Sequence, residues 1–157
     1  MVAQLRRKAR SIALQVLYEV DSADHRPDTV MLARLEDEPL ADEGAETFLR
    51  DMVFGVLRHR DLLDQLIHEH APEWPVDQMA IVDRNVPRIA IYELAMERET
   101  PLKVAINEAV ELAKLYGSDS APRFINGVLG TLANKQQQLI DAFISDSPDS
   151  TDAPASN

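Results

Sequence analysis

The sequence predicts an all-α fold, a single-domain helical bundle of about seven helices. Apolar residues recur every three or four positions along most of the chain, and no segment alternates with period two over the length of a strand. The chain has 157 residues, which is the length of one domain with one core. We expect this helical domain to span residues 1–144. Residues 145–157 are polar and acidic and predict a disordered tail.

The first half of the chain is predicted to form four helices. An apolar stripe indicates the first helix over residues 4–22. Pro27 suits the first turn of a short second helix that ends near residue 36. Asp42 is a favourable N-cap for a third helix to about residue 59. Residues 60–70 continue with their own apolar row and form the fourth helix.

The second half of the chain is predicted to add three helices. Residues 79–96 form the most apolar of them. Thr100 is a good N-cap and Pro101 suits the first helical position of the next, because a proline there loses no hydrogen bond. We expect Gly117 to end this helix in a left-handed conformation. A last long helix opens near Ser120.

Proline and glycine inside these later helices carry further expectations. Pro87 lies inside the helix over 79–96, where it removes a backbone hydrogen bond. It predicts either a kink near Asp83 or a break, with Asp83 or Asn85 as a new N-cap. Gly127 and Gly130 lie well inside the last helix, at a cost of about 1 kcal/mol each relative to Ala. They indicate that another backbone approaches closely, with ordinary helix packing as the alternative.

Charge is distributed unevenly along the chain, whose formal net charge is −11. Residues 1–10 contain four cations and no acid, whereas all 27 acids lie in the remainder. Cations at a helix N-terminus oppose the helix dipole by roughly 0.3 to 1 kcal/mol each. The basic start therefore predicts an external anion such as RNA phosphate, with a frayed, solvated end as the alternative. The cations are Arg6, Arg7, Lys8 and Arg10.

Three blocks of the sequence resemble the NusB family of transcription antitermination factors. They are RRKARSIALQVLYEVD over 6–21, DRNVPRIAIYEL over 83–94 and TPLKVAINEAVELAKLYGSDSAPRFINGVLG over 100–130. The blocks stand in the family order, although Pro87 replaces an expected Leu. The resemblance implies a NusB-like fold and binding of the boxA element of ribosomal RNA leader transcripts together with NusE, a small-subunit ribosomal protein. It further implies loading onto RNA polymerase with other Nus factors, which suppresses premature termination.

Candidate site residues fall into two groups. Arg123 and Phe124 open the last helix, where free N–H groups and an Arg favour phosphate and an exposed Phe can stack on a base. Core packing is the alternative for Phe124. We assign RNA binding to Arg6, Arg7, Lys8, Arg10, Arg123 and Phe124, and the protein-partner face to Tyr18, Asp83 and Ser120. Half-buried packing remains the alternative for Tyr18, and helix capping for Asp83.

Catalytic and metal-binding patterns are weak, so we expect neither an enzyme nor a metal or cofactor site. The chain has no Cys, and His68 and His70 face different sides of a helix. Asp61 and Asp64 are interpreted as a solvated helix surface. Glu93, Glu97 and Glu99 are interpreted as an exposed acidic run.

The chain contains neither a membrane-span-length apolar run nor a secretory signal, and we expect a cytoplasmic protein with no membrane partner. Two other functions remain open. One is the RNA-recruiting NusB-like domain of ribosomal RNA cytosine methyltransferases, and the other is a structural helical partner protein without RNA. A homodimer is also possible. Because the chain is so acidic outside its start, we expect RNA binding to need a basic protein partner.

Overall fold

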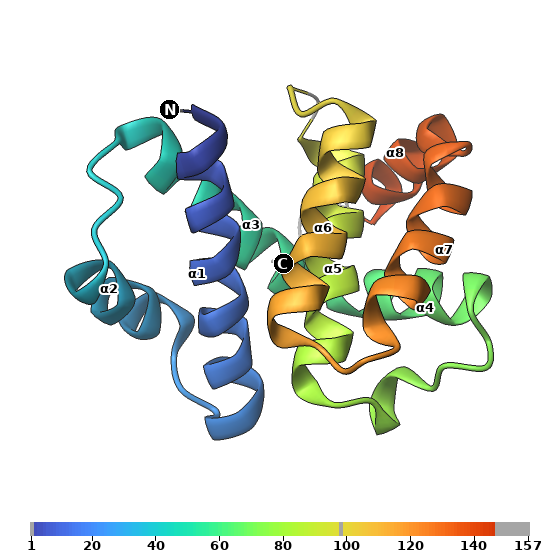
Figure 1. The fold of residues 1–157 in the computed structure, drawn as a ribbon, viewed down its shortest axis with the longest axis horizontal. Coiled ribbons are helices and arrows are strands. Elements are labelled where there is room, and N and C mark those ends of the chain that lie inside the picture. Colours follow the sequence, from blue (N-terminus) through green and yellow to red (C-terminus); the bar gives the residue numbers. More distant parts are fainter. Residues whose placement is uncertain (1, 98, 147–157) are drawn as a thin grey trace, which may run out of the picture.

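The computed structural model describes residues 2–97 and 99–146, and most of these residues are helical (Figure 1). They form eight α-helices and one short 3-10 helix, with no strand among them, which confirms the all-α prediction. In chain order the elements are α1 (Val2–Ala23), α2 (Pro27–Asp37), α3 (Glu43–Arg58), α4 (Arg60–His70), η1 (Val76–Gln78), α5 (Ile81–Met96), α6 (Leu102–Tyr116), α7 (Ala121–Ala133) and α8 (Gln136–Ser145).

Helix α5 is the centre of the fold. It packs against α1, α3, α4, α6, α7 and α8. Figure 1 shows α1 and α2 on one side of it and α7 and α8 on the other. Its sequence is apolar around most of its circumference, which is the pattern of a helix surrounded by other helices. A polar side chain on α5 is therefore buried and needs a partner from a neighbouring helix.

Two predicted helix starts are confirmed. Pro27 is the first residue of α2. Asp42 is the N-cap of α3, where its carboxylate accepts a hydrogen bond from the backbone N–H of Ala45 at 2.8 Å. Both signals act within one helical turn, so they do not depend on the rest of the fold.

Pro87 does not break α5. The helix runs without interruption from Ile81, so the predicted restart at Asp83 or Asn85 is wrong. Pro87 leaves the Asp83 carbonyl without its intrahelical donor, a local loss. The apolar side chains of α5 are buried by six neighbouring helices, and this packing outweighs that loss.

The predicted boundaries of α6 are corrected at both ends. Pro101, not Thr100, is the N-cap, and the Thr100 hydroxyl instead accepts a hydrogen bond from Arg6 at 2.9 Å. Gly117 has φ −90° and ψ 179°, so it is extended and not left-handed. A Cβ at Gly117 would lie 2.9 Å from the Ala113 carbonyl oxygen and 2.9 Å from Asp83 Oδ1. The glycine is needed for close packing and not for its φ angle.

The predicted close approach at Gly127 and Gly130 is wrong. Both positions are exposed, and nothing outside their own helix lies within 4 Å of a Cβ built on either. The close approach occurs at Gly55 in α3, where a Cβ would overlap the ring of Tyr92 from α5. Burial raises the pKa of the Tyr92 hydroxyl.

The last predicted helix is divided into α7 and α8 by a turn at Asn134 and Lys135. The turn redirects the chain so that Leu139, Ile140 and Phe143 of α8 are buried. This division accounts for eight helices instead of about seven.

The last described helix, α8, ends close to the predicted domain boundary at residue 144. Ser145 is the last residue of α8, and the Asp146 carboxylate contacts Nδ1 of the buried His59 at 2.8 Å. The rest of the predicted tail, 147–157, lies outside the described residues. No helix in the described part of the chain is long and apolar enough to cross a membrane.

Candidate nucleic-acid interface

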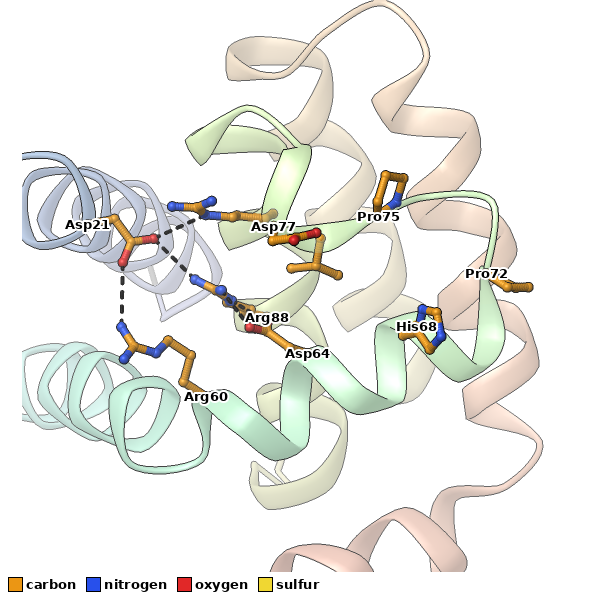
Figure 2. Close-up of a pocket in the computed structure, with 10 residues that line it drawn as sticks. Asp21, Arg60, Asp64, His68, Pro72, Pro75, Asp77 and Arg88 are labelled. Atoms are coloured by element: carbon orange, nitrogen blue, oxygen red, sulfur yellow. Dashed lines mark hydrogen bonds and ion pairs between the residues drawn. The ribbon is translucent and has the colours of Figure 1, made fainter.

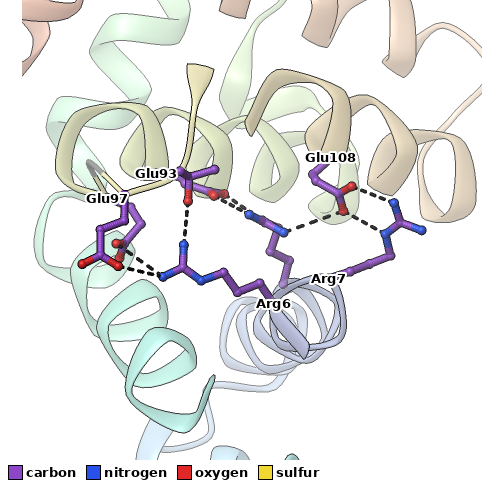
Figure 3. A network of polar contacts seen from close by, with 8 residues as sticks. Arg6, Arg7, Glu93, Glu97 and Glu108 are labelled. Carbon is purple, nitrogen blue, oxygen red and sulfur yellow. Dashed lines mark hydrogen bonds and ion pairs between the residues drawn. The ribbon is translucent and has the colours of Figure 1, made fainter. Parts of the chain in front are cut away.

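The three arginines at the start of α1, Arg6, Arg7 and Arg10, point toward acids from α5, α6 and the segment between them (Figure 3). The first turn of α1 carries no acid of its own. Because these cations oppose the helix dipole, the sequence predicts that an external anion binds them. The fold instead supplies carboxylates from residues about 80 to 100 positions away in the sequence.

Arg10 belongs to the core. Its side chain is 4% exposed, and Nε and Nη2 donate to the two carboxylate oxygens of Glu93, which is 1% exposed. The interpretation of Glu93 as part of an exposed acidic run is therefore wrong. The Arg10 guanidinium also lies 5.3 Å from the centre of the Phe48 ring. The contact joins α1 to α5, and its geometry leaves Arg10 no free edge for a phosphate.

Arg7 lies on the surface, with 66% of its side chain exposed. Nε and Nη2 donate to Glu108 of α6 at 2.9 Å and 2.7 Å. These bonds lower the pKa of the Glu108 carboxyl, and they raise the pKa of Arg7. Glu108 also lies 3.7 Å from Arg10. One carboxylate therefore faces an exposed cation and a buried one.

Arg6 is largely covered and holds the segment before α6. It donates to the Thr100 hydroxyl at 2.9 Å and to Glu99 at 3.4 Å, and it lies 4.0 Å from Glu97. Its guanidinium sits 4.7 Å from the centre of the Phe48 ring. Burial raises the pKa of Glu97, although Arg6 opposes this shift.

Lys8 completes the group and points toward the chain that enters α3, where Nζ donates to the Pro39 carbonyl at 3.1 Å. Three arginines thus face four glutamates, namely Glu93, Glu97, Glu99 and Glu108. With Lys8 included, the local net charge is close to zero. Arg7 and Lys8 are the members of this group that make only surface contacts.

The corner at the start of α7 combines a surface cation with an aromatic stack. Arg123 is exposed, whereas Phe124 is only 6% exposed and its ring stacks on Trp74 with centroids 4.5 Å apart. The exposed Phe ring required for base stacking is therefore absent. A cavity of about 470 Å³ at this corner is lined by His70, Trp74, Ser120, Arg123 and Phe124, among others. Trp74, which the sequence analysis did not select, presents the partly exposed ring.

The residues assigned to the protein partner lie in different environments. Tyr18 is 46% exposed on α1. Ser120 is exposed and caps α7 without a side-chain hydrogen bond. Asp83 is 8% exposed, and its carboxylate accepts a hydrogen bond from the Ser118 backbone N–H at 3.0 Å. Asp83 thus stabilises the loop between α6 and α7.

The basic start of α1 and the corner at α7 are separate regions. Arg7 contacts the middle of α6 at Glu108, whereas Arg123 follows the C-terminal end of that helix. The two regions line different cavities.

A further polar cluster lies between α1, α4 and α5 (Figure 2). Asp21 is 8% exposed and lies within 4.0 Å of Arg60, Arg84 and Arg88, at 3.8, 3.5 and 3.1 Å. Arg88 also donates twice to Asp64, at 2.7 and 2.8 Å. Asp64 is therefore a structural partner and not simply a solvated residue. The described residues contain no group of three or more side chains suited to holding a metal ion.

Taken together, the helical bundle and its arginine-rich first helix define a class of small all-α proteins whose first helix opens with a cluster of basic residues. The chain matches the NusB family over residues 7–134, and it belongs to that family. The transcription antitermination protein NusB of Roseiflexus sp. is 54% identical over 139 residues, covering 87% of this chain and 97% of the relative.

Solved structures agree with this assignment. A NusB structure from T. maritima superposes with a TM-score of 0.76 at 29% identity, covering 87% of this chain and 96% of that one. A NusB chain determined in complex with NusE and dsRNA superposes with a TM-score of 0.74 at 26% identity, covering 84% of this chain and 98% of that one.

Proposed function

We propose that this chain is a transcription antitermination factor that binds boxA-type ribosomal leader RNA together with NusE. The assembly is then loaded onto RNA polymerase with other Nus factors. The observation that carries this proposal is the 54% identity to a protein named transcription antitermination protein, over 97% of that protein's length. The related NusB chain in complex with NusE and dsRNA supports the two partners. The chain acts by binding and not by catalysis.

Within this proposal, two cations of α1 contact RNA and two stabilise the fold. Arg7 and Lys8 contact RNA phosphates, because they make only surface contacts in the folded chain. Arg6 and Arg10 hold α1 against its neighbours and shape the surface. Arg123 adds a cation at the far end of α6. With a net charge of −11, this chain needs a basic face from NusE for tight binding.

The methyltransferase-domain alternative receives less support. The chain spans nearly the whole length of relatives named for antitermination, 97% of the Roseiflexus sp. protein and 98% of the Bacillus pumilus protein. This favours a factor that works through partner proteins.

Titration of a fluorescent boxA-type RNA, with and without saturating NusE, tests the function. We expect NusE to tighten RNA binding, and linkage then requires RNA to tighten NusE binding by the same factor. Changing both Arg7 and Lys8 to Ala should weaken binding and reduce the salt slope by about 1.4, the value for two phosphate contacts on a single strand.

Lys114→Ala is the matched control, because Lys114 is an exposed cation of α6 that pairs with Glu111 at 3.1 Å. It should leave RNA affinity unchanged. Equal dissociation constants with and without NusE would contradict a joint site. Gel filtration of the chain alone and with NusE tests whether the chain also forms a homodimer.

A further inference from the structure

Arg7 already holds a carboxylate where an RNA-binding arginine would hold a phosphate. Its Nε and Nη2 donate to the two oxygens of Glu108, at 2.9 and 2.7 Å (Figure 3). This two-point contact is the same geometry that an arginine makes with two phosphate oxygens. The arginine faces solvent, with 66% of its side chain exposed, whereas Glu108 is 14% exposed. The donors of Arg7 are thus occupied from the protein side.

Glu108 is not the main counter-charge of the core. The buried Arg10 has its own two-point partner in Glu93, and it lies 3.7 Å from Glu108 without a hydrogen bond to it. If Arg7 turned away, Glu108 would keep a cation beside it. If a phosphate replaces Glu108 at Arg7, the Glu108 carboxylate therefore still has Arg10 as a counter-charge. Glu108 can thus compete with a phosphate for Arg7 without leaving a buried charge unpaired.

We propose that Glu108 sets the RNA affinity of this surface by occupying Arg7, so that an RNA phosphate binds there only by displacing it. The proposal rests on the proposed function. As a consequence, the basic start of α1 attracts nucleic acid only weakly in the free protein, because its exposed arginine is already paired. Phosphates of unrelated RNA gain little by displacing an existing ion pair. Additional contacts, from bases or from a basic partner protein, supply the binding free energy needed to displace Glu108 from Arg7.

The test compares Glu108→Gln with Glu111→Gln. Both changes remove one negative charge from α6, but Glu111 is exposed, with 53% of its side chain accessible, and pairs with Lys114. We expect Glu108→Gln to tighten binding of boxA-type RNA without NusE by about threefold to tenfold, because a neutral amide holds the Arg7 guanidinium less strongly than the carboxylate does. Glu111→Gln should change the affinity less than twofold.

The Arg7→Ala background isolates the contact. If Glu108 acts through Arg7, adding Glu108→Gln to Arg7→Ala gives no gain beyond that of Glu111→Gln. A gain that persists in this background overturns the proposal, because the effect is then general charge. Circular dichroism melting of each variant at the assay pH confirms that it is folded.

The outcomes separate this inference from the function on which it rests. If the wild-type chain with NusE binds boxA-type RNA and Glu108→Gln equals Glu111→Gln, Glu108 does not compete and the function stands. If neither wild type nor any folded variant binds RNA with NusE present, the proposed function itself fails, and this inference fails with it.

Discussion

The guanidinium of Arg10 and the carboxylate of Glu93 form a buried, two-point ion pair that joins α1 to α5. Nε of Arg10 donates to Glu93 at 2.8 Å, and the two side chains are 4% and 1% exposed. Arg10 and Arg7 are three residues apart on one helix and carry the same charge, yet only Arg7 faces solvent. The arginine-rich start therefore contains a structural arginine beside one that is available to a ligand.

Replacement of Arg10 is expected to destabilise the protein strongly. Arg10→Ala leaves Glu93 buried without its partner, which typically costs about 3 to 5 kcal/mol. Arg7→Ala removes a surface contact and should change the free energy of unfolding little. Urea unfolding at pH 7 measures both. Nearly equal losses in the two variants would show that the Arg10 contact is not buried in solution.

A double replacement provides the control for Arg10. Changing Arg10 to Met and Glu93 to Leu removes both charges and keeps similar volumes. Replacing a buried ion pair in this way is often neutral or stabilising. The double variant should therefore be more stable than Arg10→Ala alone, and a lower stability would assign the loss to packing of the Arg10 stem.

Two glycines provide a matched test of packing. Gly127→Ala should stabilise the protein by about 0.5 to 1 kcal/mol, because α7 gains helix propensity and nothing outside its own helix lies within 4 Å of the new Cβ. Gly55→Ala should destabilise it by roughly 1 to 3 kcal/mol, because the methyl group meets the Tyr92 ring. Thermal unfolding gives the sign of each change. The same sign in both variants would contradict the packing at one of them.

Sequence features that act within one helical turn predict most of the helices. They do not predict the contacts at the basic start of α1. Pro27 and Asp42 act within one helical turn, and the structure confirms both starts. Gly117 gives a stop signal of the same local kind, but its reason is the approach of Asp83 and Ala121 from outside the turn. Residue type alone does not separate a glycine chosen for its φ angle from one chosen for space.

The site depended on contacts between distant segments. Arg7 and Arg10 are three residues apart in the sequence, so helix geometry makes them neighbours on one face of α1. The spacing does not reveal that α5 and α6 bring Glu93 and Glu108 to that face, 83 and 101 residues away. Trp74 was missed for a similar reason, since its stacking on Phe124 arises only when α7 packs beside the turn between Pro72 and Pro75.

Tyr18 and Asp83 should separate partner binding from stability. Tyr18 is 46% exposed, so Tyr18→Ala should leave thermal unfolding nearly unchanged. If Tyr18 contacts NusE, the change should weaken NusE binding by about tenfold, a typical loss for an interface tyrosine. Asp83→Ala should lower stability by about 1 to 3 kcal/mol, because the hydrogen bond from the Ser118 backbone N–H to the Asp83 carboxylate is lost. Calorimetric titration with NusE checks the first expectation, and unchanged affinity would remove Tyr18 from the partner face.

Glu108 and Glu97 should affect the pH dependence of stability with opposite signs. The hydrogen bonds from Arg7 hold the pKa of Glu108 below its ordinary value of 4.5. Its contribution to stability is therefore present above pH 4.5 and is lost as the pH falls below that value. Burial raises the pKa of Glu97 above its ordinary value of 4.5. Its contribution is present below pH 4.5 and is lost as the pH rises through the raised pKa.

Melting temperatures of the two Gln variants, each compared with wild type at pH 7 and at pH 4, measure these signs. At pH 7, Glu108→Gln should melt below wild type and Glu97→Gln should melt above it. At pH 4 the Glu97 difference should shrink, because protonated Glu and Gln are alike in charge. The Glu108 difference should persist to lower pH, because the depressed pKa keeps that carboxylate ionised longer. Using differences from wild type at each pH cancels the titration of the other carboxylates. A Glu97→Gln variant that melts below wild type at pH 7 would show that the contact with Arg6, 4.0 Å away, outweighs the burial of the carboxylate.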